Sequence, residues 1–141
     1  MSELSVHPLT TTIGAVIEGV DLRSPLGAVH VAAIRDALRD HLVVFFRDQD
    51  ITADQQLALA CSLGEIQLPV FDNTATETAG LTVIDQSSPK GSGTDVWHAD
   101  STFMEAPPLG AILRAVRVPR AGGDTLWADM YACYEDRKSV V

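Results

Sequence analysis

The sequence lacks long apolar runs and is poor in basic residues. No stretch approaches the roughly 18 apolar residues of a membrane helix, and the first residues lack the basic start and apolar core of a secretory signal. We therefore expect a cytoplasmic protein with no membrane partner. The 141 residues include 10 Lys and Arg against 19 Asp and Glu, a formal net charge of −9. Because nucleic-acid binding depends on clustered Lys and Arg, we also expect no nucleic-acid partner.

Cysteine is scarce as well. Cys61 and Cys133 lie far apart and form no CxxC pair, so we expect two reduced, buried thiols rather than a disulfide. What the chain does have is apolar residues, which make up 46% of it and are typical of a folded domain. A chain of this length buries roughly two-thirds of the surface it exposes when unfolded, which allows one modest domain.

Three helices are predicted from periodicity and capping signals. Apolar residues recur at three- and four-residue steps over 31–42, with charged residues between them, which indicates an amphipathic helix. Thr52 followed three residues later by Gln55 is a capping-box signature, and Gly64 would close that helix as its C′ residue. A last helix would start at an Asp cap and run over 129–135.

Segments rich in β-branched and apolar residues predict the strands, and turn-rich segments separate them. The run LVVFF at 42–46 is continuous, so we expect it to be buried on both faces. A turn is expected at 122–124, where two glycines precede an aspartate. The other predicted strands are 10–20, 81–85, 110–118 and 125–128.

The stretch WHADSTF at 97–103 holds a histidine and an aspartate two positions apart. On a strand such residues face the same side, so the imidazole of His98 and the carboxylate of Asp100 can converge on one ion. Two histidines and one carboxylate form the ligand set of non-haem Fe(II) oxygenases. An HxD pair also arises often by chance. The alternative is a strand histidine that bonds to Asp100 or to the backbone.

Further segments accompany this pair in order along the chain. Pro107-Pro108 follows WHAD, and GGDTLW stands at 122–127. This combination resembles the taurine dioxygenase-like family of Fe(II)/2-oxoglutarate-dependent oxygenases, which carry a WHTD-type metal motif, a nearby pair of prolines and a GGDTLW segment. The resemblance covers nearly the whole chain to about Tyr134 and includes IGAVIEGVDL (13–22), VVFFRDQ (43–49) and LGE (63–65).

The resemblance implies a fold, a pair of cofactors and a reaction. The fold class would be α+β, a double-stranded β-helix (jelly-roll) oxygenase fold with flanking helices, incomplete because residues 1–141 form only the N-terminal portion of one domain. His98 and Asp100 would bind Fe(II) and carry the catalysis, and Thr125 would hydrogen-bond a carboxylate of the co-substrate 2-oxoglutarate. The enzyme would hydroxylate a small organic substrate with O₂ and release succinate and CO₂.

In this family a distal histidine, the third metal ligand, and an arginine that pairs with 2-oxoglutarate lie in a segment beyond Val141. We therefore expect little or no turnover from the 141-residue chain alone, and unpaired strand edges. The alternative function is a non-catalytic remnant that retains a partial, two-ligand metal site. A homo-oligomer in which another chain completes the site also stays open.

Four positions bear on the substrate. Leu68 and Phe71 stand where the taurine enzymes have a histidine and a tyrosine, and Thr94 stands where they have a substrate-contacting asparagine. The loss of these polar groups disfavours taurine and favours a more apolar substrate. Phe103 is a further candidate lining residue, although aromatic residues such as Phe103 are more often part of a core, as we expect for Trp97 and Trp127. An alkyl sulfate or sulfonate, an aryloxy acid or another small organic acid remains open.

Overall fold

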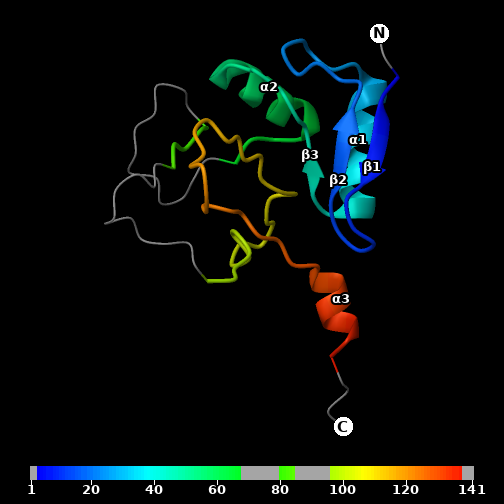
Figure 1. Ribbon diagram of the computed structural model, residues 1–141, viewed down its shortest axis with the longest axis vertical. Helices are drawn as coiled ribbons and strands as arrows, with labels where there is room; N and C mark the ends of the chain where they lie inside the picture. The colour runs from blue at the N-terminus through cyan, green and yellow to red at the C-terminus, as the bar shows by residue number, and fades with distance from the viewer. Residues whose placement is uncertain (1–2, 68–79, 85–95, 138–141) are drawn as a thin grey trace.

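The computed structural model describes residues 3–67, 80–84 and 96–137. Within them, a three-stranded mixed sheet packs with helices, which confirms the α+β class (Figure 1). The sheet has the order β1-β2-β3, where β2 pairs antiparallel with β1 and parallel with β3. The elements in chain order are β1 (Ser5–Pro8), β2 (Ala15–Glu18), α1 (Ala28–His41), β3 (Val44–Phe45), α2 (Ala53–Leu63) and α3 (Met130–Glu135).

β1 and β2 form a hairpin that the sequence only half predicts. The predicted strand over 10–20 is shortened to Ala15–Glu18, because the amides at 12 and 13 bond to the Thr10 hydroxyl oxygen instead of a neighbouring strand. β1 was not predicted, since Pro8 interrupts its apolar pattern. An edge strand tolerates proline, because its outer amides need no partner strand.

α1 connects β2 to the parallel strand β3 and carries the first half of the core. Ile34 and Ala37 on α1 are buried against Ile17 of β2, and Val44 of β3 packs on the same cluster. The opposite face of α1 is charged, and Arg39 there forms an ion pair with Asp36. The amphipathic helix predicted over 31–42 is therefore confirmed.

α2 begins at the predicted capping box. The Thr52 hydroxyl accepts from the Gln55 amide at 3.2 Å, and the Gln55 side chain accepts from the Thr52 amide at 2.7 Å. Gly64 ends the helix as its C-cap in an extended conformation, rather than as a C′ residue. A second buried cluster of Leu22, Ile51 and Leu59 anchors α2 to the rest of the core.

The residues described after α2 form no strand, so the strands predicted over 81–85, 110–118 and 125–128 are wrong wherever the structure describes them. A strand is stable only beside a hydrogen-bonding neighbour, and among the described residues no other strand runs beside these segments. Apolar side chains there are consequently exposed, as at Val116 with 80% of its surface accessible. The described residues thus form no jelly roll.

Three features complete the description of the fold. Asp129 caps α3 as predicted, accepting from the amides of Tyr131 and Ala132. Both thiols, Cys61 and Cys133, are free but exposed, so the expected absence of a disulfide is confirmed and the expected burial is wrong. The described residues contain no helix with the length and apolar character to cross a membrane.

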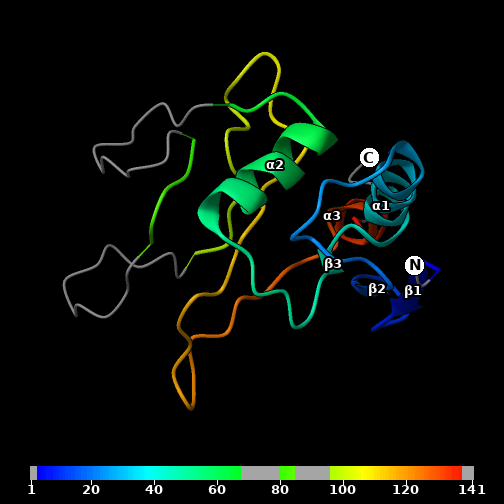
Figure 2. The same ribbon diagram turned by 90° about the horizontal axis from the view of Figure 1, so that it is seen from above.

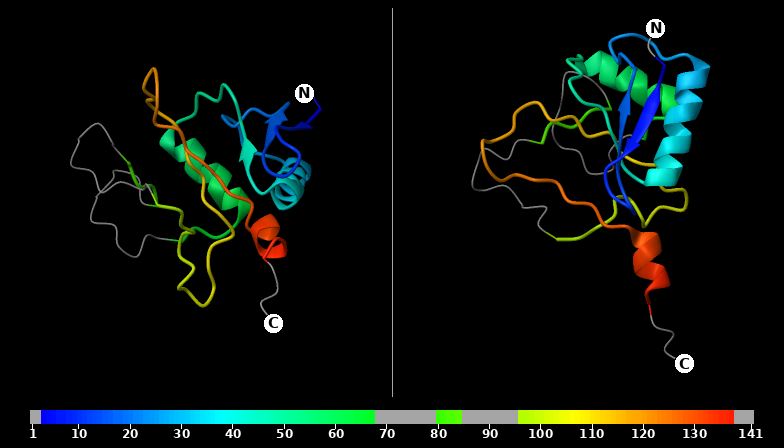
Figure 3. Two further views of the ribbon diagram at one scale, coloured as in Figure 1. Left: turned by 60° about the horizontal axis from the view of Figure 1, so that its bottom comes forward. Right: turned by 45° about the vertical axis from the view of Figure 1, so that its right-hand side comes forward.

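Side chains of the N-terminal half hold the long segment between 96 and 128 in place. The Gln56 amide on α2 donates to the Ile112 carbonyl at 3.2 Å. The rings of Phe45 on β3 and Trp127 meet edge to face, with centroids 5.3 Å apart. This segment therefore runs past α2 and β3 before it enters α3 (Figures 2 and 3).

Candidate metal centre

The predicted metal motif lies on a turn, not on a strand. Residues 97–99 are irregular, and a turn follows over 100–103. Ser101 adopts a positive φ of 55°, and the Met104 amide bonds to the Ser101 carbonyl at 3.1 Å. The strand geometry from which the convergence of His98 and Asp100 was predicted is therefore wrong.

The two side chains nevertheless face each other. His98 Nε2 lies 3.4 Å from Asp100 Oδ1, and His98 Nδ1 lies 2.8 Å from the Val96 carbonyl oxygen. A carbonyl can only accept, so this hydrogen bond requires the proton on Nδ1. In the neutral imidazole, Nε2 then carries the lone pair, and it is Nε2 that faces the carboxylate. The backbone thus presents the ring in the tautomer that a metal ligand needs.

The distance between these atoms fits a shared divalent ion. Ligand atoms about 2.1 Å from a metal and at right angles to each other lie about 3.0 Å apart, close to the observed 3.4 Å between Nε2 and Oδ1. An imidazole nitrogen with a carboxylate oxygen is also a donor set that suits Fe(II). As an ion pair alone the contact contributes little stability, because the two side chains are 50% and 72% exposed.

His98 and Asp100 have no third protein ligand in the part of the chain that the structure describes, where no group of three His, Cys, Asp or Glu side chains could hold a metal. A pair of ligands leaves most of the coordination sphere of an ion to water or small molecules. We therefore expect weak metal binding by these two residues alone.

Thr125 lies on the second predicted motif and is exposed. Gly122 and Gly123 precede it with φ of 76° and 74°, the left-handed conformation expected for glycines that reverse the chain. In the described parts of the chain, the Thr125 side chain forms no hydrogen bond with His98 or Asp100. The structure places Thr125 after a tight reversal without joining it to the metal pair.

The aromatic residues near the two motifs are not core residues. Trp97 and Phe103 are each 70% exposed and Trp127 is 45% exposed, so the core expected for these rings is wrong. Leu68, Phe71 and Thr94, the other predicted lining positions, lie outside the described residues.

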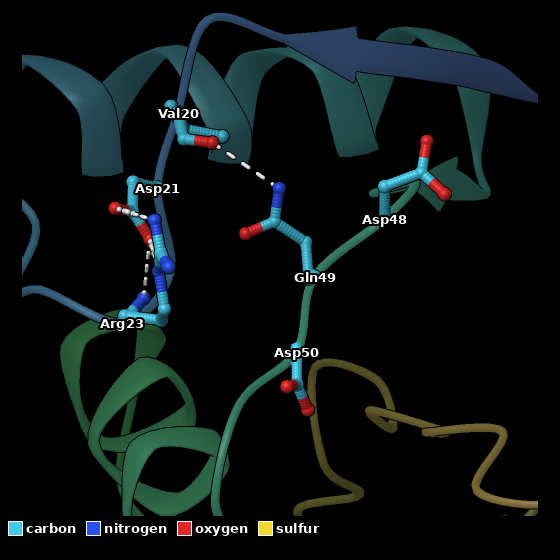
Figure 4. A pocket seen from close by; sticks show the side chains of 6 residues that line it. All are labelled: Val20, Asp21, Arg23, Asp48, Gln49 and Asp50. Carbon is cyan, nitrogen blue, oxygen red and sulfur yellow. Dashed lines mark hydrogen bonds and ion pairs between the residues drawn. The ribbon is translucent and has the colours of Figure 1, made fainter.

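A polar hollow of about 200 Å³ lies on the N-terminal half and contains none of the predicted site residues. Its carboxylate Asp21 pairs with Arg23 at 2.8 Å, and the hydrogen bonds from Arg23 lower the pKa of Asp21 to about 2. Gln49 donates to the Val20 carbonyl (Figure 4). Its side-chain oxygen accepts from the Leu22 amide, so its polar groups serve the fold. No sequence signal pointed to this hollow.

Comparison with known proteins decides between an isolated HxD pair and a family motif. Residues 5–138 match the family described as "Taurine catabolism dioxygenase TauD, TfdA family". The chain belongs to this family. The match includes both the His98–Asp100 pair and Thr125, and it confirms the family expected from WHAD and GGDTLW.

Relatives within the TauD, TfdA family carry more specific names. The chain is 43% identical over 136 residues to the alpha-ketoglutarate-dependent sulfate ester dioxygenase of Pseudomonas putida, covering 95% of this chain and 44% of that protein. It is 40% identical over 136 residues to the alkylsulfatase of Acinetobacter baylyi, covering 95% of this chain and 42% of that protein. The chain thus spans less than half the length of these relatives.

A solved taurine dioxygenase from Burkholderia xenovorans overlaps with 50% of this chain and 26% of its own, at 43% identity and a TM-score of 0.46. The Pseudomonas putida relative is named as a dioxygenase that depends on alpha-ketoglutarate, which is 2-oxoglutarate.

Proposed function

We propose that this chain carries the first two metal ligands of an Fe(II)- and 2-oxoglutarate-dependent dioxygenase. The observation that carries the proposal is the 3.4 Å approach of His98 Nε2 and Asp100 Oδ1, with His98 Nδ1 bonded to the Val96 carbonyl. Membership of the TauD, TfdA family supports the choice of metal and co-substrate. Residues 1–141 are the N-terminal portion of one double-stranded β-helix domain in this proposal, and its other half supplies the remaining ligand.

Each residue of the site has a distinct task. His98 offers Nε2 to the metal, and its bond to Val96 keeps the ring from rotating. Asp100 supplies an anionic oxygen beside it. The Thr125 hydroxyl donates a hydrogen bond to a carboxylate of 2-oxoglutarate, which orients the co-substrate. When bound, the iron supplies O₂ activation coupled to the decarboxylation of 2-oxoglutarate.

We further propose that the substrate is an alkyl sulfate ester. Two relatives at 43% and 40% identity are named for sulfate esters and alkyl sulfates, and the apolar residues Leu68 and Phe71 at two predicted lining positions suit an alkyl chain. Hydroxylation of the carbon next to the ester oxygen gives an unstable product that separates into an aldehyde and inorganic sulfate. Succinate, CO₂, aldehyde and sulfate then form in equal amounts.

The test supplies Fe(II), ascorbate, 2-oxoglutarate and hexyl sulfate, and measures succinate and sulfate together. It is run on the 141-residue chain, from which we expect little turnover, and on the product of any longer reading frame that contains it. The proposal requires both products in equal amounts and their loss in His98→Ala, whereas His30→Ala on α1 keeps them. Faster turnover of taurine or phenoxyacetate would overturn the substrate class.

A different outcome would favour the non-catalytic alternative. If the longer product also forms no succinate with any of the three substrates, yet still binds Zn(II) through His98 and Asp100, the site is a metal site without oxygenase activity. Near-stoichiometric metal after dialysis of the 141-residue chain would instead indicate a third ligand, contributed by another copy of the chain.

A further inference from the structure

The two faces of β3 have different partners. Val44 packs toward α1 with the buried cluster around Ile34. Side chains alternate along a strand, so the neighbouring Phe45 points to the opposite face of the sheet. There its ring meets Trp127 with centroids 5.3 Å apart and ring planes at 83°. The face of the sheet that α1 leaves open is therefore covered, at this strand, by a residue 82 positions later.

The Phe45 ring is itself fixed by its surroundings. Behind it lies Gly14, where a Cβ atom would come within 3.6 Å of the ring, so the ring lies directly over the backbone. The guanidinium of Arg47 lies 5.3 Å from the ring centroid, a favourable cation–π distance. Gly14 is tied to the end of α1 through its amide, which bonds to the His41 carbonyl at 2.8 Å. The Phe45 ring thus has contacts with the sheet on one side and with Trp127 on the other.

Trp127, in contrast, belongs to an otherwise exposed segment. Residues 121–128 are all exposed, and Trp127, at 45%, is less exposed than Leu126 before it, at 70%. Thr125 lies two residues before Trp127, and two glycines with positive φ precede Thr125. Glycine gives the chain little resistance to bending. The contact at Trp127 therefore restrains Thr125 from its C-terminal side, whereas the glycines on its N-terminal side restrain the backbone little.

We infer that Phe45 is a positioning residue that fixes Thr125 through Trp127. Its functional meaning rests on the proposed function, because Thr125 is the residue assigned there to 2-oxoglutarate. The positional relationship itself needs no bound cofactor. An aromatic pair of this geometry adds favourable energy beyond the area it buries, and Phe45→Leu removes the ring while leaving an apolar side chain.

The test follows the Thr125 methyl signal by NMR in chains labelled at the threonine methyl groups, with the signal assigned by Thr125→Ser. Phe45→Leu should shift this signal, and Phe45→Tyr, which keeps the ring, should restore it. Phe46→Leu is the matched control, since Phe46 packs against the buried clusters and has no ring contact with Trp127. It should lower the unfolding temperature without moving the Thr125 methyl signal.

A second measurement follows Trp127 fluorescence in a Trp97→Phe background, which leaves one tryptophan. Phe45→Leu should shift its emission to the red and increase its quenching by acrylamide, because the indole loses its cover. If Phe45→Leu leaves both the Thr125 methyl signal and Trp127 emission unchanged, the inference is overturned.

Titration with 2-oxoglutarate in the presence of Zn(II) separates this inference from the proposed function. If 2-oxoglutarate moves the Thr125 signal, Phe45→Leu should weaken its affinity by about two- to tenfold, the range set by the energy of one aromatic pair. If 2-oxoglutarate leaves the signal unmoved while Phe45→Leu still shifts it, the cofactor role of Thr125 fails and the positioning by Phe45 stands.

Discussion

His98 and Asp100 face each other across 3.4 Å on a turn, and the Val96 carbonyl holds the far nitrogen of the imidazole. With the proton on Nδ1, an unprotonated Nε2 and a carboxylate oxygen at this distance have no hydrogen between them and repel each other weakly. A cation shared by both atoms, or a second proton on the ring, removes that repulsion. The geometry of the pair therefore suits either a shared metal ion or an imidazolium–carboxylate ion pair.

Metal affinity should depend on both members of this pair. We expect His98→Ala and Asp100→Asn each to weaken Zn(II) binding at least tenfold, since loss of one of two ligands leaves a single-ligand site. The measurement is competition with a chromogenic chelator at fixed pH. Glu105→Gln is the matched control, because it removes one nearby exposed negative charge without touching the pair. Equal affinities for Asp100→Asn and Glu105→Gln would show that the chain binds metal only through its net charge.

The sequence predicted the helices because their signals are local. The periodicity of α1 and the caps at Thr52 and Asp129 depend on residues within four positions of each other, and all three are present in the structure. Strands depend on distant partners, so the apolar composition of 110–118 could predict a strand but could not supply a neighbour for it. β1 was missed for the converse reason, since its partner Ala15–Glu18 compensates for a weak local pattern.

The site shows the same division between local and distant information. The prediction that His98 and Asp100 converge assumed a strand, whereas the structure brings Nε2 and Oδ1 within 3.4 Å on irregular backbone that leads into a turn. The motifs gave the correct family, whose match over residues 5–138 spans both WHAD and GGDTLW. The contact between Phe45 and Trp127 joins residues too distant for any local pattern to predict.

Stability should depend on α1 packing against the sheet. Ile34 is 1% exposed and lies against Ile17 and Ala37, so Ile34→Ala should lower the free energy of unfolding by about 2 to 4 kcal/mol. Val29→Ala on the same helix is the control, because Val29 is 82% exposed and should change that energy by less than about 0.5 kcal/mol. Urea unfolding followed by circular dichroism measures both. Because alanine favours the helix at both positions, similar losses for the two variants would contradict the claim that burial of Ile34 stabilises α1.

Gln49 should contribute more to stability than an ordinary polar residue, because its side-chain amide bonds to the backbone at both Val20 and Leu22. It accepts from the Leu22 amide at 3.0 Å and donates to the Val20 carbonyl at 3.2 Å. Gln49→Ala should lower the free energy of unfolding by about 1 to 3 kcal/mol. Gln49→Glu should not rescue it, since a carboxylate has no hydrogen to donate to Val20. Gln56→Ala is the control. It removes one exposed hydrogen bond to the Ile112 carbonyl and should lower the free energy of unfolding by less than Gln49→Ala does.

Acid should weaken the fold through Asp21. Hydrogen bonds from Arg23 lower the pKa of this carboxyl from 3.8 to about 2, so the folded state favours the ionised form. A carboxyl with a lowered pKa in the folded state stabilises the protein above its unfolded pKa, and that stabilisation is lost as pH falls from about 4 towards about 2. Asp21→Asn should remove this part of the pH dependence.

The Asp21–Arg23 ion pair should change the unfolding temperature only slightly, because solvent screens an exposed pair. This change should be smaller still in 1 M salt. Unfolding temperatures measured at pH 5, 4, 3 and 2 for the parent chain and Asp21→Asn give the comparison. The difference between the two chains should be constant above pH 4 and narrow below it. Arg23→Gln should behave like Asp21→Asn, since either change removes the ion pair. A difference that stays constant down to pH 2 would contradict the prediction, because it would show that the contribution of Asp21 does not depend on its ionisation.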